Sequence, residues 1–239
     1  MKIIQKGNKA TNSSSRDGHV PIAIVDHISG GTMSSMDAWF TSTGNVQSSA
    51  HFGVSKSGEI HQYVSIERKA WANGLSIANI SKATAAIIKE HPKTNPNNYT
   101  VSIEHEGTDG ALTEAQFVAT VWLHKYISDE VKRIYGKPIA LDERHVIGHF
   151  QVDPKRKPYC PGPKFPWSRL YNALITKEAD EVKKDVVVSV LVNGKKVADG
   201  VADEGVTYTP ARAVAEALGA KVDYDAKTKT MTITSKGDK

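Results

Sequence analysis

The sequence predicts an α/β domain, in which helices cover a β-sheet, followed by a small α+β module rich in strands. Three observations support this prediction. Short β-branched runs alternate with helical patterns through residues 1–175. A highly charged segment with few large apolar residues follows at 176–185, and we interpret it as a linker. Residues 186–239 then show mainly the alternation and the turn signals of β-hairpins.

The strands of the first domain are predicted by short apolar runs that are bounded by turn signals. The first run, "PIAIVDHIS", ends near His27, where a side chain can project from the edge of a sheet. Another contains "VSIEHEG", in which alternation places Ser102, Glu104 and Glu106 on one face. Two acids side by side indicate either a working face or a solvated one. The predicted strands lie at 21–29, at 49–64 (two strands joined by a turn at Ser57-Gly58), at 98–107 and at 145–150.

The clearest helix is predicted at 112–136. Thr113 and Gln116 have the spacing of a capping box, and Gly136 lies where a helix commonly ends. Because the helix alternates with strands along the chain, it is expected to cover one face of the sheet. Its apolar face is predicted to consist of Phe117, Val118, Val121 and Trp122.

In the C-terminal module, Asn193-Gly194 is a strong hairpin signal between two predicted strands. Pro210 and Gly219 mark the start and the end of a predicted helix. The segment "KVDYDAKTKTMTIT" alternates like two further strands. The module contains no His, Cys or Trp, so we expect it to bind or to act as a spacer rather than to catalyse a reaction.

The composition argues against several classes of protein. The formal net charge is +5, and the surplus lies before residue 176, since eleven basic and eleven acidic residues cancel after it. No arginine-rich helix or aromatic-basic stripe accompanies the charge, so nucleic acid is not an expected partner. No apolar run approaches the roughly 18–20 residues that span a bilayer, so no membrane partner is expected. The start lacks a signal-peptide core and one cysteine forms no internal disulfide, which predicts synthesis in the cytoplasm.

Two histidines and the only cysteine are candidates for a metal site. Cys160 lies in "RKPYCPGPKFPW", a basic, proline-stiffened stretch that is a poor place to bury a thiol. His27 and His149 each end a predicted strand. Two imidazoles and one thiolate would form an open tetrahedral zinc site with a fourth position for water. Either histidine alone is more often a hydrogen-bonded core or surface residue, so only the combination favours a metal.

Five segments in order resemble the motifs of type 2 N-acetylmuramoyl-L-alanine amidases: "IVDHISGG", "SAHFGVSKSGEIHQYV", "ERKAWANGLS", "VSIEHEGTDG" and "VIGHFQVDPKRKPYCPGPKFPW". Peptidoglycan recognition proteins and phage lysozyme-type amidases share this zinc amidase fold. The resemblance covers roughly residues 18–175. It implies a central mixed sheet flanked by helices, with a zinc cleft at one edge, one Zn²⁺ per chain, and hydrolysis of the amide between N-acetylmuramic acid and L-alanine. The family's metal ligands match His27, His149 and Cys160.

The resemblance also implies roles for charged residues. Glu104 matches the family's general base and acid. Glu106 is the second choice for that role and is expected to contact the substrate. A basic residue usually stands two places before the last ligand, where this chain has Pro158. Lys157, one place earlier, is therefore expected to stabilise the oxyanion, an effect typically worth ~3 kcal/mol per donor. Arg156 remains the alternative.

Three further residues match positions beside the family's substrate groove. His51 is expected either behind the metal ligands or facing the substrate, with simple packing as the alternative. Trp71 and Asn73, in "AWANG", lie in a loop that lines the groove in relatives. An aromatic side chain there would pack on sugar or peptide, although a core tryptophan is an equally good interpretation.

The C-terminal module resembles the copper amine oxidase N-terminal-like, or stalk, repeat of bacterial wall-associated proteins, on the pattern "VLVNGK…YTPARAVAEALGAKVDYDAKTKTMTI". This implies wall attachment and not copper chemistry. An amidase joined to such a module, without a signal peptide, resembles a phage or prophage endolysin that is made in the host cytoplasm and acts on peptidoglycan after release, here expected as a monomer. The alternatives are a host autolysin, a non-catalytic recognition module, a muropeptide-recycling amidase and a cysteine hydrolase that uses Cys160.

Overall fold

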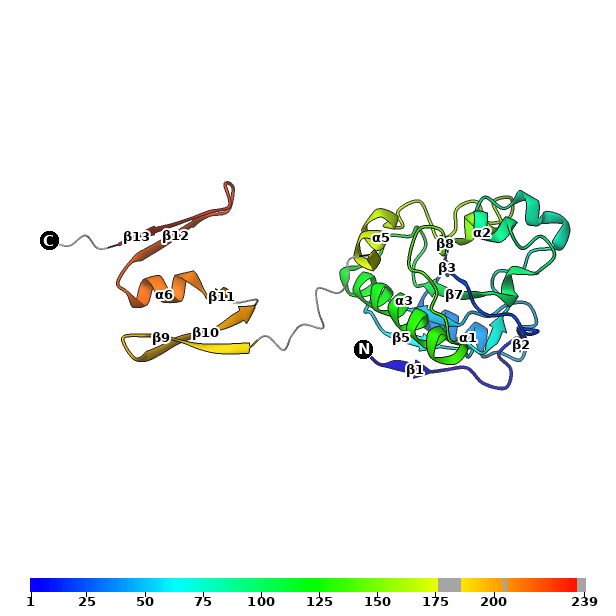
Figure 1. Ribbon diagram of the computed structural model, residues 1–239, viewed down its shortest axis with the longest axis horizontal. Coiled ribbons are helices and arrows are strands. Elements are labelled where there is room, and N and C mark those ends of the chain that lie inside the picture. Colours follow the sequence, from blue (N-terminus) through cyan, green and yellow to red (C-terminus); the bar gives the residue numbers. More distant parts are fainter. Residues whose placement is uncertain (176–185, 204–205, 236–239) are drawn as a thin grey trace. The chain divides into compact units, whose positions relative to one another are not determined.

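The computed structural model describes residues 1–175, 186–203 and 206–235. The chain divides into two compact units, Met1–Thr176 and Lys177–Lys239, which are coloured from blue to yellow-green and from yellow to red in Figure 1. The predicted linker at 176–185 lies outside the described residues. Each unit is described separately below.

A six-stranded sheet in the order β1-β5-β4-β7-β3-β8 forms the centre of the first unit. β4 and β5 pair antiparallel, whereas every other neighbouring pair in this sheet is parallel. The mixed sheet is therefore confirmed. Its strands are β1 (Ile3–Gln5), β3 (Ala23–Ile28), β4 (Phe52–Val54), β5 (Ile60–Gln62), β7 (Thr100–His105) and β8 (Val146–Gly148), and a separate ribbon pairs β2 (Ser13–Ser15) with β6 (Arg68–Ala70).

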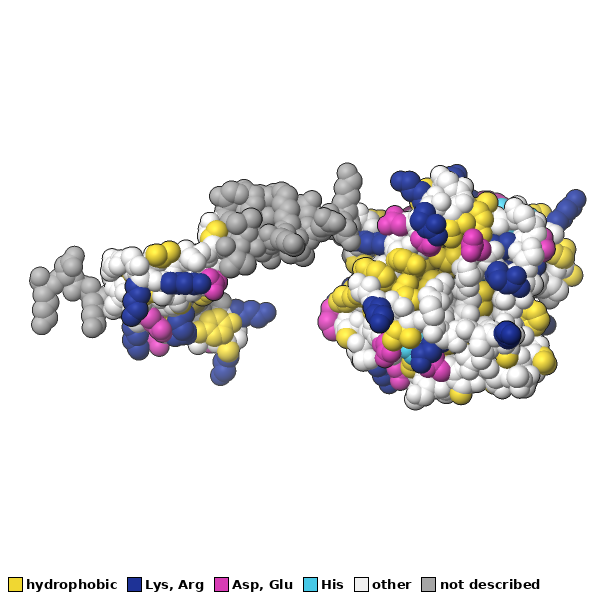
Figure 2. All heavy atoms as spheres, turned by 90° about the horizontal axis from the view of Figure 1, so that it is seen from below, with side chains coloured by type: hydrophobic (Ala, Val, Ile, Leu, Met, Phe, Trp, Pro, Cys, Tyr) yellow, Lys and Arg dark blue, Asp and Glu magenta, His cyan; other side chains and the backbone are white. Residues whose placement is uncertain are grey.

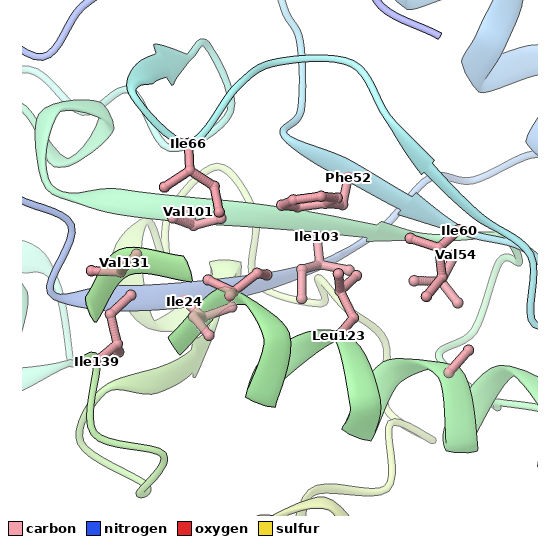
Figure 3. Close-up of a cluster of buried hydrophobic side chains, with 12 residues drawn as sticks. Ile24, Phe52, Val54, Ile60, Ile66, Val101, Ile103, Leu123, Val131 and Ile139 are labelled. Atoms are coloured by element: carbon pink, nitrogen blue, oxygen red, sulfur yellow. The ribbon is translucent and has the colours of Figure 1, made fainter. Parts of the chain in front are cut away.

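Helix α3 (Glu114–Tyr135) covers one face of the sheet, as Figure 3 shows. Leu123 is fully buried and lies against Ile103 of β7, within a cluster that also includes Phe52 and Ile24. Burying one such aliphatic side chain contributes roughly 1.5–3 kcal/mol, so this layer is a main source of the unit's stability.

Two details of the α3 prediction are wrong. The Thr113 side chain caps the helix by accepting the Gln116 backbone N–H, but the Gln116 side chain donates to the Val54 and Glu106 carbonyls instead of returning to Thr113. Val118, predicted to be on the apolar face, is 46% exposed. The buried face instead follows the spacing of Ala119, Leu123, Ile127 and Val131 and includes the polar side chains of Gln116, Thr120 and His124.

The opposite face of the sheet is covered by shorter elements. Helix α1 (Met33–Phe40) packs with Tyr63 and Val64, and the segment of η1 (Ile77–Lys82) and α2 (Ala86–Lys89) packs with β3 and β8. The remaining short elements of this unit are η2 (Pro96–Asn98), α4 (His149–Val152) and α5 (Trp167–Ile175). Since α1 follows β3 and α4 directly follows β8, both helices lie near the end of the sheet where these two strands stop.

The second unit is small and rich in strands, as predicted. β9 (Val186–Val192) and β10 (Lys195–Asp203) form a hairpin, and Asn193 and Gly194 take the positive φ angles, 51° and 77°, that the tight turn requires. The other elements are β11 (Val206–Tyr208), α6 (Ala211–Ala217), and the antiparallel pair β12 (Lys221–Asp225) and β13 (Thr230–Thr234).

No helix among the described residues is long and apolar enough to cross a membrane. Figure 2 shows one face of the molecule, on which lysine and arginine side chains are spread out and mixed with acidic ones. On this face the basic side chains do not gather into a single stripe.

Candidate active site

Three side chains that can bind a metal ion come together where β3 ends. His27 lies in β3, His149 is the first residue of α4, and Cys160 lies in the loop that follows α4. The ligand atoms of the three residues all lie within 4.8 Å of one another. The two imidazole ring centroids are 4.3 Å apart. The sequence predicted this set of three residues, and the fold brings all three together.

Strand register explains why they meet. β3 pairs in parallel with both β7 and β8, so that His27 lies opposite Glu104 and Asp26 lies opposite Gly148. The chain enters α4 immediately after Gly148, which brings His149 beside His27. Since alternate residues of a strand face opposite sides, His27 and Glu104 share the face opposite α3.

The orientation of the His27 ring is fixed by an amide behind it. The Asn73 Nδ2 group donates to Thr100 Oγ1 at 2.8 Å, and Thr100 Oγ1 donates to the Pro96 carbonyl at 2.7 Å. This leaves Asn73 Oδ1 to accept the His27 Nε2–H at 2.7 Å. The free lone pair of His27 is therefore on Nδ1, which faces Glu104 Oε1 at 3.7 Å. A ring held in this tautomer can bind a metal through Nδ1.

The Cys160 thiol is positioned by backbone contacts. The Ile28 N–H donates to Cys160 Sγ at 3.4 Å. The Phe150 N–H donates to the Cys160 carbonyl, and the Cys160 N–H donates to the Lys157 carbonyl. Burial, followed by the charge of Glu104, raises the pKa of this thiol to about 12. A bound metal cation would reverse that effect, because a coordinating thiol loses its proton.

Both imidazoles are neutral near neutral pH, which is the form that binds metal. Burial, then the charges of Lys157 and Arg156, lower the pKa of His149 to about 3. Burial, then the repulsion that a protonated His149 would exert, lower the pKa of His27 well below its ordinary value.

Glu104 is a half-buried acid without a full set of partners. Its Oε2 atom is buried and has no hydrogen-bond partner among the residues that the structure describes. Burial raises the pKa of Glu104 to about 8, although the charge of Lys157 opposes the shift. A carboxyl group with a pKa close to neutrality can both accept and donate a proton at physiological pH.

Two neighbouring cations line the site but differ in their contacts. The Arg156 side chain forms an ion pair with Asp153, and its Nη2 donates to the Gly74 carbonyl at 2.8 Å. Arg156 therefore braces one loop against another. Both cations act electrostatically on His149, whereas of the two only Lys157 acts on Glu104 and on Cys160. These contacts favour Lys157 over Arg156 as the cation that faces the reacting groups.

A cavity of about 870 Å³ opens over these groups. Aromatic and polar side chains surround the charged ones, as is typical of a ligand site. Its lining includes His27, Glu104, His149, Arg156, Lys157 and Cys160, together with Ser35, Met36, Trp39 and Phe40 of α1, residues 47–49, and Trp71, Ala72, Gly74 and Asn97.

The other predicted site residues lie in different surroundings. Trp71 lines the cavity, whereas Asn73 is buried and contacts the His27 ring. His51 is 1% exposed, hydrogen-bonds Ser102, and is not among the residues that line the cavity. It thus lies behind the site.

Glu106 also lies away from the cavity lining. Its Oε2 atom accepts the Lys56 backbone N–H at 2.8 Å, which ties the end of β7 to the turn after β4. The alternation that groups Glu106 with Glu104 is therefore insufficient to give the two acids the same surroundings.

The predicted set omits Trp39, which lines the cavity from α1. A signal for α1 exists in the sequence, because Thr32 is a good helix N-cap, and Met33, Met36 and Phe40 follow at helical spacing. Trp39 lies next to Phe40 and outside that apolar set, so the pattern finds the helix without revealing what Trp39 faces.

Comparisons with known proteins give a family match for each unit. Residues 17–163 match the family model of N-acetylmuramoyl-L-alanine amidases, and residues 191–239 match that of the copper amine oxidase N-terminal domain. The chain is 29% identical over 141 residues to 1,6-anhydro-N-acetylmuramyl-L-alanine amidase AmpD of Escherichia coli strain K12, covering 59% of this chain and 65% of that protein. The chain thus spans just under two thirds of the length of this relative. It is 28% identical over 166 residues to N-acetylmuramoyl-L-alanine amidase A of Achromobacter lyticus, covering 64% and 82%.

Solved structures share the fold of the first unit. A selenomethionine derivative of AmpD matches with a TM-score of 0.55 and 24% identity, covering 72% of this chain and 94% of that one. N-acetylmuramoyl-L-alanine amidase LysC from Clostridium intestinale matches with a TM-score of 0.50 and 18% identity, covering 73% and 97%. At these identities the likeness shows the mixed sheet with flanking helices.

Proposed function

Because the chain belongs to the N-acetylmuramoyl-L-alanine amidase family, we propose that it hydrolyses the amide between N-acetylmuramic acid and L-alanine in peptidoglycan. In this proposal His27, His149 and Cys160 hold one zinc ion, Glu104 transfers protons and Lys157 stabilises negative charge. The observation that carries the proposal is the meeting of three metal-binding side chains beside a buried carboxyl oxygen without a partner.

The residues present fit a zinc ion. Two neutral imidazoles and one thiol form a donor set typical of zinc, and three protein ligands leave a position open for reactants. Asn73 fixes the His27 tautomer, as second-shell acceptors of metal-bound histidines commonly do. When bound, zinc supplies Lewis acidity, which makes water a stronger acid and polarises a carbonyl group.

Glu104 has the position for proton transfer. Glu104 of β7 lies on the same face of the sheet as His27 of β3, and it lines the cavity. We propose that it takes a proton from the attacking water and delivers it to the amine of L-alanine as the amide bond breaks. General acid–base catalysis of this kind contributes typically ~10²–10⁴-fold in rate.

Lys157 would act on the carbonyl oxygen. As water attacks, that oxygen gains negative charge, and a cation already in place stabilises it without reorganisation. The engagement of Arg156 with Asp153 and with the Gly74 carbonyl supports assigning this role to Lys157.

We further propose that the full chain acts on the bacterial cell wall, as a phage or prophage endolysin would. The match of residues 191–239 to the copper amine oxidase N-terminal domain, together with the resemblance of this module to the stalk repeats of wall-associated proteins, supports a wall-attachment role for the second unit. One second candidate is release of peptides from soluble 1,6-anhydro muropeptides, which the name of the Escherichia coli relative favours.

Product analysis tests the reaction. The full chain is incubated with purified wall and with a soluble 1,6-anhydro muropeptide, and the products are identified by mass spectrometry. We expect free lactyl carboxyl groups and new L-alanine amino termini, lost with a chelator and restored by zinc. Cleavage of a glycosidic or peptide bond, or full activity after complete metal removal, would contradict the proposal. Activity on the anhydro muropeptide alone would favour the second candidate.

A further inference from the structure

Trp39 is a large aromatic side chain exposed inside the cavity. It lies near the end of α1 and is 45% exposed, and Trp71, which also lines the cavity, is 37% exposed. Indole rings of this size are usually largely buried, and exposed aromatic surface in a concave site marks ligand contact.

Both tryptophans are held by adjacent serines. The Trp39 Nε1–H donates to Ser48 Oγ at 2.9 Å, and the Trp71 backbone N–H donates to Ser49 Oγ at 2.8 Å. The two aromatic residues are thus tied to consecutive positions of one loop, and the Trp71 indole N–H also donates to Ser14 Oγ at 3.1 Å.

A buried asparagine holds that loop in place. Asn45 is 2% exposed, and its Nδ2 donates to the carbonyls of Trp39 and Ser48. Its Oδ1 accepts the backbone N–H groups of Gln47 and Ser48. Because these contacts fix the loop before any ligand arrives, binding at Trp39 costs little conformational entropy.

Charge is distributed unevenly around the cavity. Among the described residues that line it, those from α1 and from residues 47–49 carry no charge, whereas Arg156 and Lys157 supply cations elsewhere in the lining. A muramyl peptide has a similar division, because its sugar ring presents apolar C–H faces and hydroxyl groups, and its peptide carries carboxylates.

We propose that Trp39, together with Trp71, forms the subsite that binds the sugar ring of the substrate. The indole face packs on the C–H face of the ring, and polar groups of residues 47–49 lie near its hydroxyl groups. Trp39 thereby determines specificity for substrates that carry a sugar. This inference rests on the proposed amidase function, but sugar binding can be measured without turnover.

The test uses the full chain, zinc-loaded, with two substrates that share the scissile amide. One is a muramyl dipeptide, and the other is the corresponding lactoyl dipeptide, which lacks the sugar. Trp39→Ala is expected to raise KM for the muramyl dipeptide roughly tenfold with little change in kcat, the scale of a lost aromatic contact. KM for the lactoyl dipeptide should stay unchanged. Trp39→Phe, which keeps a ring, should restore most of the binding.

Trp122→Phe is the matched control, because Trp122 stacks on Tyr126 of α3 and does not line the cavity. Binding of N-acetylmuramic acid by calorimetry supplies a readout that is independent of catalysis. Weaker sugar binding by Trp39→Ala supports the subsite even if the chain cleaves neither substrate, a result that would overturn only the amidase proposal. Equal changes on both substrates, or unchanged sugar binding, would overturn the role of Trp39.

Discussion

Glu104 and Glu106 lie two residues apart, yet their contacts predict different losses on substitution. Glu104 faces the cavity with one oxygen unpartnered, whereas Glu106 accepts the Lys56 N–H outside it. Glu104→Gln should keep its zinc and lose ~100-fold or more in kcat, because the amide cannot transfer protons. Glu106→Gln should cost far less. Steady-state rates and zinc content of both variants are the measurements, and the opposite order would show that Glu106 is the proton-transfer group.

Substitutions of Lys157 and Arg156 should also have different effects. Lys157→Ala should lower kcat by ~10²–10³-fold, the usual effect of removing one oxyanion-stabilising group, with zinc content unchanged. Arg156→Ala should mainly lower the denaturation midpoint, since Arg156 connects Asp153 to the Gly74 carbonyl. If Arg156→Ala produced the larger kinetic loss and Lys157→Ala the larger loss of stability, the two assignments would have to be exchanged.

Sequence reasoning found the site residues that lie near the ends of strands, although His149 begins α4 instead of ending the strand predicted at 145–150. His27 and His149 follow from apolar runs that stop at a histidine, and Cys160 follows from its unusual surroundings. The contact between Asn73 and His27 joins residues 46 positions apart, and no local pattern encodes it. Trp39 was missed for a related reason, because its exposure depends on the loop at residues 42–49 and not on its own helix.

At the scale of elements, the helix α3 forms as predicted, but part of its predicted buried face is wrong. The sheet presents Asp26 and His105 toward this helix, so the helix buries Thr120 and His124 opposite them. Val118 is then exposed, although its apolar side chain and its position in the helix predict that it is buried. Helix periodicity gives the existence and bounds of α3, but the polar groups of the sheet decide which residues face it.

The contact between α3 and β3 predicts a pH dependence of stability. His124 Nδ1–H donates to the Thr120 carbonyl, and Nε2 faces Asp26 Oδ2 at 3.2 Å, with His105 nearby. Burial lowers the pKa of His124, but the charge and hydrogen bond of Asp26 outweigh it, so the pKa is raised from 6.5. The stability that this pair contributes is therefore present below pH 6.5 and is lost as pH rises through the raised pKa.

Replacing the His124 imidazole tests the direction of this pH dependence. His124→Gln should lower the free energy of unfolding more at about pH 6 than at about pH 9, measured by urea denaturation of the full chain. His145→Gln is a control in a different contact, because His145 pairs with exposed Asp142. A loss for His124→Gln that is equal at both pH values would show that His124 is neutral in the folded protein.

On the scale of the whole molecule, the two units should contribute separately. A chain that ends at Thr176 retains the sheet, the candidate ligands and Glu104, so it should cleave soluble muramyl peptides at nearly the full rate. Its lysis of intact wall should fall, because a linked binding module raises the effective concentration of the enzyme at an insoluble substrate. Pelleting with wall is the measurement, and equal pelleting of the full and shortened chains would leave the second unit without the proposed role.

Salt provides an internal check on that assignment. The net charge of +5 lies before residue 176, so any wall binding by the first unit should weaken as salt screens it. Binding through the second unit, whose charges cancel, should depend less on salt. The motifs of both units are visible in the sequence, but the parallel pairing of β3 with β7 and β8 joins distant segments, and no local pattern encodes it.

Zinc content and amide cleavage, measured on the same preparations, test the central claim most directly. Full-length protein should carry about one zinc per chain and cleave muramyl peptides. His27→Ala, His149→Ala and Cys160→Ser should each lose both zinc and cleavage, while His19→Ala, a half-buried histidine outside the cavity, should keep both. Full zinc and full cleavage in any of the three ligand variants, or cleavage by protein shown to be free of metal, would contradict a zinc-dependent site at these residues.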